Sequence, residues 1–315
     1  MQYRKLGNSG ITCSVIGLGT WAMGGDSFGK VDDKNSRDTV RAAIDAGITL
    51  IDTAPAYGNG HAEEVVGEAL QGADRTRVVI ATKFGVLRTP DGGYLRSAKP
   101  DSLRGQLEMS LRRLRTDYID LYQFHWPDKN TPIPDALAEI VKFRDEGKIR
   151  AIGLSNFSPS QIDEARQVCP IASLQPPYSL LDRAYEKELR PYCAKNGIGV
   201  LSYGSIGAGV LSGKYTERPV FTGSDTRAGF YARFYSEENW PRTQALVDAL
   251  RRAAQPHGAP VVQAAINWVL SSPEMTAALV GAKTPQQAAQ NAAAADWELT
   301  EDEMLAITKA ADALA

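Results

Sequence analysis

Short apolar runs alternate along the chain with longer segments in which apolar residues recur at helical spacing. The runs predict eight strands, near 15–18, 48–52, 78–82, 118–123, 149–154, 171–175, 198–202 and 277–280. The longer segments predict eight helices, near 35–46, 61–70, 102–114, 133–146, 159–167, 184–196, 260–271 and 285–295. Alternating strands and helices are typical of a parallel sheet with crossover helices. Eight such units predict an α/β protein of the closed (β/α)8 TIM barrel type.

Three further segments lie outside this eightfold repeat. Residues 2–14 are expected to form an N-terminal β-hairpin, and 240–255 and 301–313 two additional helices. The longest irregular region, 216–239, follows the seventh strand. A loop of that length inside a compact domain is usually functional or mobile, so we expect a cover over a ligand, with a variable surface excursion as the alternative. No interdomain linker is evident, and 1–315 is expected to be a single domain.

Composition excludes several classes of protein. Apolar residues make up 43% and charged residues 23% of the 315, which suits a globular protein with a large core. With 35 basic against 37 acidic residues, the net charge of −2 gives no reason to expect nucleic acid or a membrane surface as partner. The three cysteines are widely spaced without a CxxC pair, and only three histidines occur, so no metal site is expected. The chain lacks an apolar leader or an apolar run long enough for a membrane span, and a reducing cytoplasm is the expected location.

Four polar residues come at the ends of consecutive predicted strands or in the loop that follows. Asp52 closes the second strand, Tyr57 lies in the next loop, and Lys83 and His125 close the two apolar runs that follow. Since strand ends of an α/β protein face a crevice, these side chains are expected to lie together. A phenol has a reference pKa of about 10, which a neighbouring ammonium is expected to lower. The carboxylate would hold the ammonium, and the imidazole would donate a hydrogen bond to a substrate oxygen.

Each of these residues also has a purely structural interpretation. Asp52 and Lys83 could form an ion pair at the barrel rim, but Tyr57 five positions after Asp52 favours chemistry. His125 could be a core histidine bonded to a backbone carbonyl. Pro127 argues against that interpretation, because it ends the strand and leaves the imidazole at the rim.

Asp, Tyr, Lys and His in this order resemble the tetrad of the aldo-keto reductases. The segments 16–21, 52–58, 116–122, 147–157, 211–215 and 280–283 also resemble signatures of that family, in family order and from the first strand to the last. The resemblance implies an NADP(H)-dependent oxidoreductase that reduces aldehydes or ketones reversibly, with a small-molecule carbonyl substrate. Tyr57 would be the general acid, tuned by Lys83, which Asp52 anchors, while His125 orients the carbonyl oxygen.

The resemblance also implies a cofactor site. Ser155, Asn156 and Gln175 match the set that binds the carboxamide, although Ser155 and Asn156 could equally be a helix N-cap pair. Tyr203 matches the residue whose ring stacks on the nicotinamide. The glycine-containing run that follows would wrap the pyrophosphate with backbone amides, through Gly204, Ser205, Ile206, Gly207, Gly209 and Leu211.

The remaining expected contacts lie at strand ends on either side of the cofactor. Lys283 and Thr284 match the position that grips the adenosine 2′-phosphate, with Gln287 and Asn291 toward the adenine. Gly19, Thr20 and Gly281 complete the cofactor set. The substrate is expected to meet aromatic walls formed by Trp21 and Trp126 together with Tyr57 and His125.

The chain departs from many relatives near the cofactor. Gln287 stands where they carry an arginine and Gln290 where they carry a glutamate, which leaves one cation for the phosphate. NADP(H) is the expected cofactor, with use of NAD(H) left open. Gly204-Ser205 replaces a common Ser-Pro, and Gln175-Pro176-Pro177-Tyr178 lacks the asparagine that commonly precedes the tyrosine.

Two other functions are compatible with the same residues. The chain resembles bacterial branches that act on inositol-related or sugar aldehydes, so it could be a sugar or polyol dehydrogenase working in the oxidative direction. It could also be a cofactor-sensing regulatory subunit, as in the potassium-channel β-subunits, which retain the tetrad. Rapid multiple turnover would distinguish an enzyme from a sensor. The sequence indicates no oligomeric state.

Overall fold

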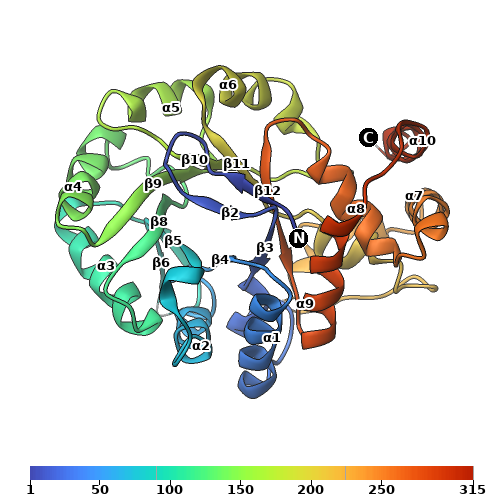
Figure 1. The fold of residues 1–315 in the computed structure, drawn as a ribbon, viewed down its shortest axis with the longest axis horizontal. Coiled ribbons are helices and arrows are strands. Elements are labelled where there is room, and N and C mark those ends of the chain that lie inside the picture. The colour runs from blue at the N-terminus through green and yellow to red at the C-terminus, as the bar shows by residue number, and fades with distance from the viewer. Residues whose placement is uncertain (90, 224, 315) are drawn as a thin grey trace.

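In the computed structural model, which describes residues 1–89, 91–223 and 225–314, eight parallel strands close into a barrel (Figure 1). Around the barrel their order is β3 (Ile16–Gly19), β4 (Leu50–Asp52), β5 (Val79–Phe84), β8 (Ile119–Phe124), β9 (Ile149–Ser155), β10 (Ser173–Gln175), β11 (Gly199–Ser202) and β12 (Met275–Gly281). The predicted (β/α)8 barrel is confirmed. Because all eight strands run in one direction, their carboxyl ends meet at one face of the barrel.

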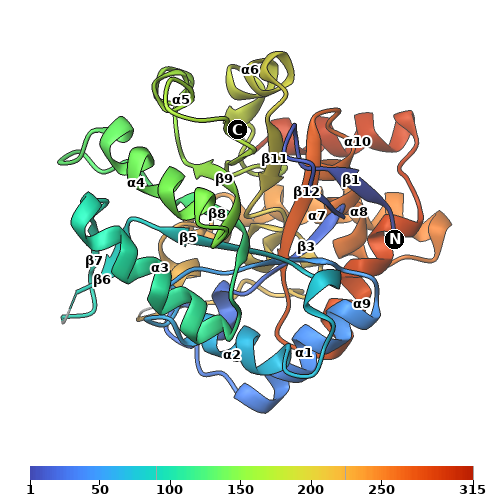
Figure 2. The same ribbon diagram turned by 60° about the vertical axis from the view of Figure 1, so that its left-hand side comes forward.

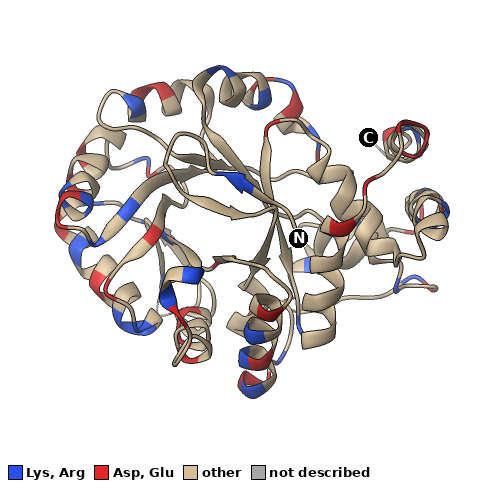
Figure 3. Ribbon diagram, viewed as in Figure 1, with Lys and Arg blue, Asp and Glu red and all other residues tan. Residues whose placement is uncertain are grey.

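Helices surround the barrel as an outer layer (Figures 1 and 2). They are α1 (Asp33–Asp45), α2 (His61–Ala69), α3 (Pro100–Leu114), α4 (Ile133–Asp145), α5 (Pro159–Arg166), α6 (Leu189–Asn196), α8 (Val261–Leu270) and α9 (Pro285–Ala292). The two predicted additional helices are also present, as α7 (Trp240–Ala254) and α10 (Glu301–Asp312), which pack against each other. Acidic and basic residues are interspersed along the outer helices (Figure 3).

The N-terminal hairpin crosses the amino-terminal end of the barrel (Figure 1). Strand β1 (Tyr3–Lys5) pairs antiparallel with β2 (Thr12–Ser14), as predicted. Between them, Leu6 is fully buried and packs against Leu50, Leu121 and other inward-facing strand residues. Gly7 has φ +50° and approaches the backbone of Gly199 so closely that a Cβ would lie 2.6 Å from its nitrogen. The hairpin therefore plugs the end of the barrel opposite the strand carboxyl ends.

Several predicted boundaries were wrong by two or more residues: the second strand begins at Leu50 rather than 48, and the helix expected at 285–295 ends at Ala292. The helix expected at 184–196 is a 3₁₀ turn, Ala184–Glu186, followed by α6 from Leu189. A helix starting at 184 would have Pro191 in its interior, where the missing N–H and the ring clash are costly, whereas α6 places that proline in its first turn. The sixth strand begins at Ser173 rather than 171, directly after the segment in which Ala172 donates its N–H to Ile152 O.

A second hairpin was not predicted. Strand β6 (Val86–Arg88) continues beyond β5 and pairs antiparallel with β7 (Tyr94–Arg96). Each strand has only three residues, and all three of β7 are exposed, so no buried alternation marks them in the sequence. The hairpin stands beside α3 in Figure 2.

The segment 216–239 is largely irregular, with 3₁₀ turns at Thr226–Ala228 and Ala232–Tyr235. It reaches the loop after β3, where the Thr226 N–H donates to Ser27 O at 2.9 Å. In the described ranges, no helix combines the length and apolar character needed to cross a membrane. Those same ranges contain no cluster of three or more histidine, cysteine, aspartate or glutamate residues placed to hold a metal ion.

Candidate active site

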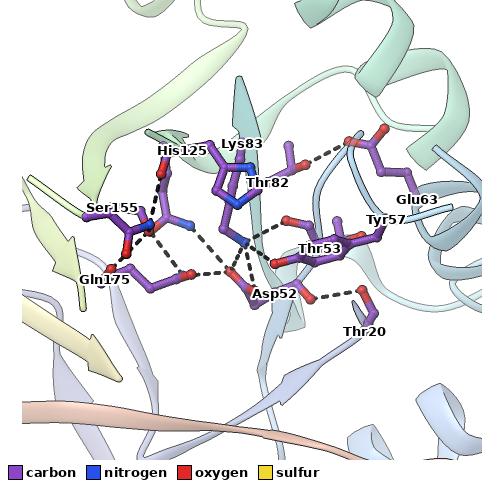
Figure 4. A network of polar contacts seen from close by, with 12 residues as sticks. Thr20, Asp52, Thr53, Tyr57, Glu63, Thr82, Lys83, His125, Ser155 and Gln175 are labelled. Atoms are coloured by element: carbon purple, nitrogen blue, oxygen red, sulfur yellow. Dashed lines mark hydrogen bonds and ion pairs between the residues drawn. The ribbon is translucent and has the colours of Figure 1, made fainter. Parts of the chain in front are cut away.

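The ends of the neighbouring strands β4 and β5 bring a buried ion pair next to a phenol (Figure 4). Lys83 Nζ donates to both carboxylate oxygens of Asp52, at 2.9 and 2.8 Å, and to Thr53 O at 3.0 Å. The same ammonium lies 3.3 Å from Tyr57 Oη. Lys83 is fully buried and Asp52 nearly so, whereas Tyr57 is half-buried. The fold thus aligns carboxylate, ammonium and phenol in a row that ends at the barrel face.

His125 follows β8 directly and faces the same phenol. Its ring centroid is 6.1 Å from that of Tyr57, with the planes nearly perpendicular. The backbone on either side of the ring is held, because the His125 N–H donates to Phe84 O at 3.0 Å and Asn156 Nδ2 donates to His125 O at 3.1 Å. All four residues expected to act together therefore lie together.

The pKa of Tyr57 depends on how deeply its hydroxyl is buried. Burial raises the pKa of this hydroxyl well above its usual value, and the charge of Asp52 and the hydroxyl of Tyr94 raise it further. Burial therefore dominates the pKa of Tyr57, and the expected lowering by the Lys83 ammonium stays a prediction. Burial also lowers the pKa of Lys83, and the Asp52 carboxylate opposes this lowering. Tyr57 thus keeps its proton at neutral pH.

His125 is neutral at neutral pH. Burial lowers its pKa well below the usual value, and the charges of Lys83 and Arg96 lower it further. A neutral imidazole has one N–H donor and one lone pair. It can therefore donate a hydrogen bond without carrying a charge.

We expect this pKa shift to make stability depend on pH. Below about pH 6.5, the unfolded chain protonates His125 while the folded chain does not, so the free energy of unfolding falls as the pH drops toward the folded pKa. Uptake of one proton limits the slope to about 1.4 kcal/mol per pH unit, and solvent around the half-buried ring reduces it further. Urea unfolding at about pH 7.5 and about pH 5.5 measures it. His125→Asn should lose this component, and an unchanged pH dependence in that variant would contradict the assignment.

Gln123 belongs to the same network and was missed by the sequence analysis. It pairs in register with Lys83 and donates to Asp52 Oδ1 at 3.4 Å, while Gln175 Nε2 donates to the same oxygen at 2.8 Å. Room for the Gln123 side chain comes from Gly153, where a Cβ would lie 3.0 Å from Gln123 Cγ. Its signal is a polar residue inside an apolar strand, two positions before His125.

Glu63 was also missed. It is fully buried on α2 and accepts a hydrogen bond from Thr82 Oγ1 at 2.7 Å (Figure 4). It also pairs with Arg113 at 3.2 Å. Burial raises the pKa of Glu63, whereas its bonds to Thr82 and Arg113 act to lower it. The charge of Glu63 in turn opposes the lowering of the Lys83 pKa by burial. A glutamate at a helical position gives no sequence signal of burial, so only the packing of α2 on β5 identifies it.

The residues expected to bind a carboxamide form one hydrogen-bonded group. Asn156 Nδ2 donates to Ser155 Oγ at 3.0 Å, and Tyr203 Oη donates to Asn156 Oδ1 at 2.9 Å. Ser155 Oγ donates to Gln175 O at 2.9 Å. Asn156 has φ +65°, a left-handed conformation that asparagine tolerates better than most residues. The alternative role of Ser155 and Asn156 as a helix cap is wrong, because Ser158 caps α5.

The expected pyrophosphate loop has a backbone suited to anions. Positive φ angles recur at Gly204, Gly207, Ala208 and Gly209, so the chain folds back on itself instead of forming a regular helix. Within the described part of the chain, the N–H groups of Ser205 and Ile206 have no acceptor, although Ser205 is buried. Two other residues were predicted to belong to this loop. A Cβ on Gly209 would lie 3.2 Å from Lys214 Nζ, and Leu211 is fully buried. Turns of this kind expose N–H groups to a phosphate.

The expected adenosine-phosphate end is preorganised by its own side chains. Thr284 Oγ1 accepts from the Gln287 N–H and caps α9, and Gln287 Oε1 accepts from the Lys283 N–H at 2.8 Å. Asn291 Nδ2 donates to Gly281 O at 3.3 Å. Lys283 Nζ donates to Phe28 O. Gln287 and Asn291 therefore hold the loop after β12.

Cations gather around Lys283. Burial lowers its pKa, and the charges of Arg227 and Lys214 lower it further, against the opposing charge of Asp225. Arg227 is paired with Asp225 at 2.6 Å, which leaves the two lysines as the freer charges. Together with the open amides of the preceding loop, this charge fits the phosphate groups of a dinucleotide.

The other expected contacts lie at neighbouring strand ends. Gly19 pairs in register with Gly281 on one side and Asp52 on the other, and Thr20 Oγ1 donates to Asp52 O at 3.0 Å. Trp21 stacks on Tyr57 with ring centroids 6.0 Å apart.

Trp126, next to His125, lies instead under the Arg96 guanidinium, whose carbon is 4.5 Å from the ring centre. Of the two tryptophans expected to line the substrate site, Trp21 therefore contacts the Tyr57 ring. Trp126 is instead covered by Arg96 of the hairpin that was not predicted.

Comparisons with known proteins agree with this geometry. A model of the aldo/keto reductase family matches residues 15–312. Aldo-keto reductase YhdN of Bacillus subtilis is 42% identical over 96% of this chain and 91% of its own length. The NADH-specific methylglyoxal reductase of Escherichia coli is 35% identical over 100% of this chain and 99% of its own. The solved structure of glycerol dehydrogenase AKR11B4 from Gluconobacter oxydans has a TM-score of 0.89 at 39% identity and covers 98% of this chain and 94% of that one.

Proposed function

The chain belongs to the aldo/keto reductase family, and on that premise we propose that it reduces small aldehydes and ketones reversibly with NADPH. The observation that carries the proposal is the contact of one buried ammonium with both the Asp52 carboxylate and the Tyr57 hydroxyl. A bound nicotinamide cofactor supplies the hydride. Side chains of this chain would supply the proton, orient the carbonyl oxygen and stabilise the phenolate that is left.

Tyr57 is the proton donor in this proposal. Its raised pKa keeps the hydroxyl protonated, and its position at the barrel face lets it reach a carbonyl oxygen. As negative charge develops on that oxygen, the proton moves from Tyr57 Oη, and the adjacent Lys83 ammonium stabilises the phenolate that is left. The neutral His125 donates its N–H to the same oxygen and orients it. Asp52, with Gln175 and Gln123 bonded to it, holds Lys83 in place.

Steady-state oxidation of NADPH with methylglyoxal, glyceraldehyde and butanal tests the reaction. We expect turnover with at least one of them, together with slower reduction of NADP⁺ by glycerol in the reverse direction. The solved relative named glycerol dehydrogenase supports including this polyol. Failure of every carbonyl compound, with cofactor binding intact, would favour the regulatory alternative.

The preference for NADPH over NADH is expected to depend on Lys283. A charge-assisted contact with the 2′-phosphate is worth about 1.5–3 kcal/mol, so Lys283→Met should raise the KM for NADPH roughly 10–100-fold and leave that for NADH nearly unchanged. The loose cluster of Lys283, Lys214 and Arg227 supports this assignment. Steady-state kinetics with both cofactors measures it.

Gln287→Arg is the matched opposite variant. Adding a further cation on the turn of α9 next to Lys283 should lower the KM for NADPH selectively. If Lys283→Met raised both KM values equally, the lysine would hold the loop through Phe28 O without contacting a phosphate, and the NADPH assignment would fail.

A further inference from the structure

The hairpin formed by β6 and β7 stands at the carboxyl end of the barrel next to the candidate active site. It begins three residues after Lys83. The segment after its return strand is fixed by two bonds, Ser97 N–H to Gly85 O at 3.0 Å and Ala98 N–H to Asp128 Oδ2 at 3.0 Å. On the other side, Arg88 pairs with Asp26 at 2.8 Å. The hairpin is thus tied both to the loop that carries Trp126 and to the loop that carries Trp21.

Strand β7 carries two side chains beside the loops that border the tetrad, with Arg96 over Trp126, the neighbour of His125, and Tyr94 under the Arg88 guanidinium. Tyr94 and Arg96 lie two positions apart, on one face of the strand. The Tyr94 hydroxyl is near enough to raise the pKa of Tyr57, and the charge of Arg96 is near enough to lower the pKa of His125. Both side chains are exposed, so they border the reaction site at its open edge.

Arg96 differs from other arginines around this region. Arg88 and Arg227 each have a carboxylate partner, at 2.8 and 2.6 Å. Among the residues that the structure describes, Arg96 has neither an acidic partner nor a hydrogen-bond acceptor. Its guanidinium instead stacks on Trp126, 4.5 Å from the ring centre. A guanidinium held over an aromatic ring keeps N–H groups available, and a guanidinium can bind carboxylate or phosphate oxygens in pairs.

We propose that Arg96 binds an anionic group on the substrate, so that the preferred substrates are short aldehydes or ketones with a carboxylate or phosphate a few carbons from the carbonyl. This inference rests on the proposed function, because it takes the carbonyl oxygen to lie at Tyr57 and His125. Trp126 then serves as the platform for the cation. The anion is bound at the open edge of the site, where its charge remains partly solvated.

The experiment compares charged and uncharged substrates of similar length. Succinic semialdehyde is paired with butanal, and glyceraldehyde 3-phosphate with glyceraldehyde, which also separates carboxylate from phosphate. For the wild type we expect kcat/KM to favour the charged member of at least one pair by about tenfold or more, and the preference to weaken in about 0.5 M salt. Arg96→Gln should abolish the preference through KM and leave the neutral member unchanged. Arg104→Gln, at an exposed arginine paired with Glu146 on the outer helices, is the control and should behave as wild type.

Arg96→Lys distinguishes a bidentate site from a simple positive charge, and an intermediate preference is expected. Equal efficiency within both pairs in the wild type would overturn the inference. So would an equal loss for charged and neutral substrates in Arg96→Gln, which would mean that the arginine only supports Trp126. Absence of turnover with all four compounds would instead overturn the proposed function, so the two failures are distinguishable.

Discussion

Tyr57→Phe is expected to lower kcat for aldehyde reduction by about 10²–10⁴-fold, the range for loss of a positioned general acid. The phenylalanine keeps the ring that packs on Trp21 but lacks the proton that the raised pKa of Tyr57 retains. Since the hydroxyl contacts only the Lys83 ammonium among the described residues, little else should change. Rapid-mixing kinetics of NADPH oxidation measures the effect.

Cofactor binding, followed by quenching of protein fluorescence, should be unchanged in this variant. Tyr3→Phe is the control, because Tyr3 lies on the N-terminal hairpin and donates to Gly47 O far from the site. It should keep full activity. If Tyr57→Phe retained more than about a tenth of the wild-type kcat, another group would have to be the acid.

Lys83→Met is expected to cost about 3–5 kcal/mol of folding free energy, as well as most of the activity. Removing one partner of a buried ion pair leaves the other charge uncompensated. Here the Asp52 carboxylate would keep only the neutral amide donors of Gln175 and Gln123. Urea unfolding near neutral pH measures the difference from wild type.

The double variant Asp52→Asn with Lys83→Met separates the charge from the packing. Because it removes both charges, it should recover part of the stability lost in Lys83→Met, while activity stays low. A single variant within about 1 kcal/mol of wild type would show that the pair contributes little to the fold.

The barrel and the positions of the tetrad could be predicted from the sequence because both depend on local patterns. Buried parallel strands are continuous apolar runs, and the residue that ends each run falls at the same face of the barrel. Asp52, Lys83 and His125 are such residues. The family resemblance added Tyr57, whose loop position alone carries no signal of proximity to Lys83.

What could not be predicted depends on which groups surround each side chain. The pKa of Tyr57 depends on burial and on two groups from separate segments, Asp52 and Tyr94, and the sequence does not show how deeply the hydroxyl is buried. Gln123 and Glu63 are polar residues whose burial follows only from packing. The hairpin that brings Arg96 over Trp126 consists of two three-residue strands, of which β7 is fully exposed, so the sequence carries no pattern that predicts it. The role proposed for Arg96 in substrate specificity therefore follows only from the fold.

Counting turnovers separates catalysis from cofactor sensing more directly than any variant. Purified protein is mixed with excess NADPH and a panel of neutral and anionic aldehydes, and the NADP⁺ and alcohol formed per protein molecule are measured. We predict many turnovers, with NADP⁺ and alcohol formed in equal amounts. At most one equivalent of each per protein, with NADPH tightly bound and no aldehyde giving more, would contradict the assignment of this chain as a carbonyl reductase.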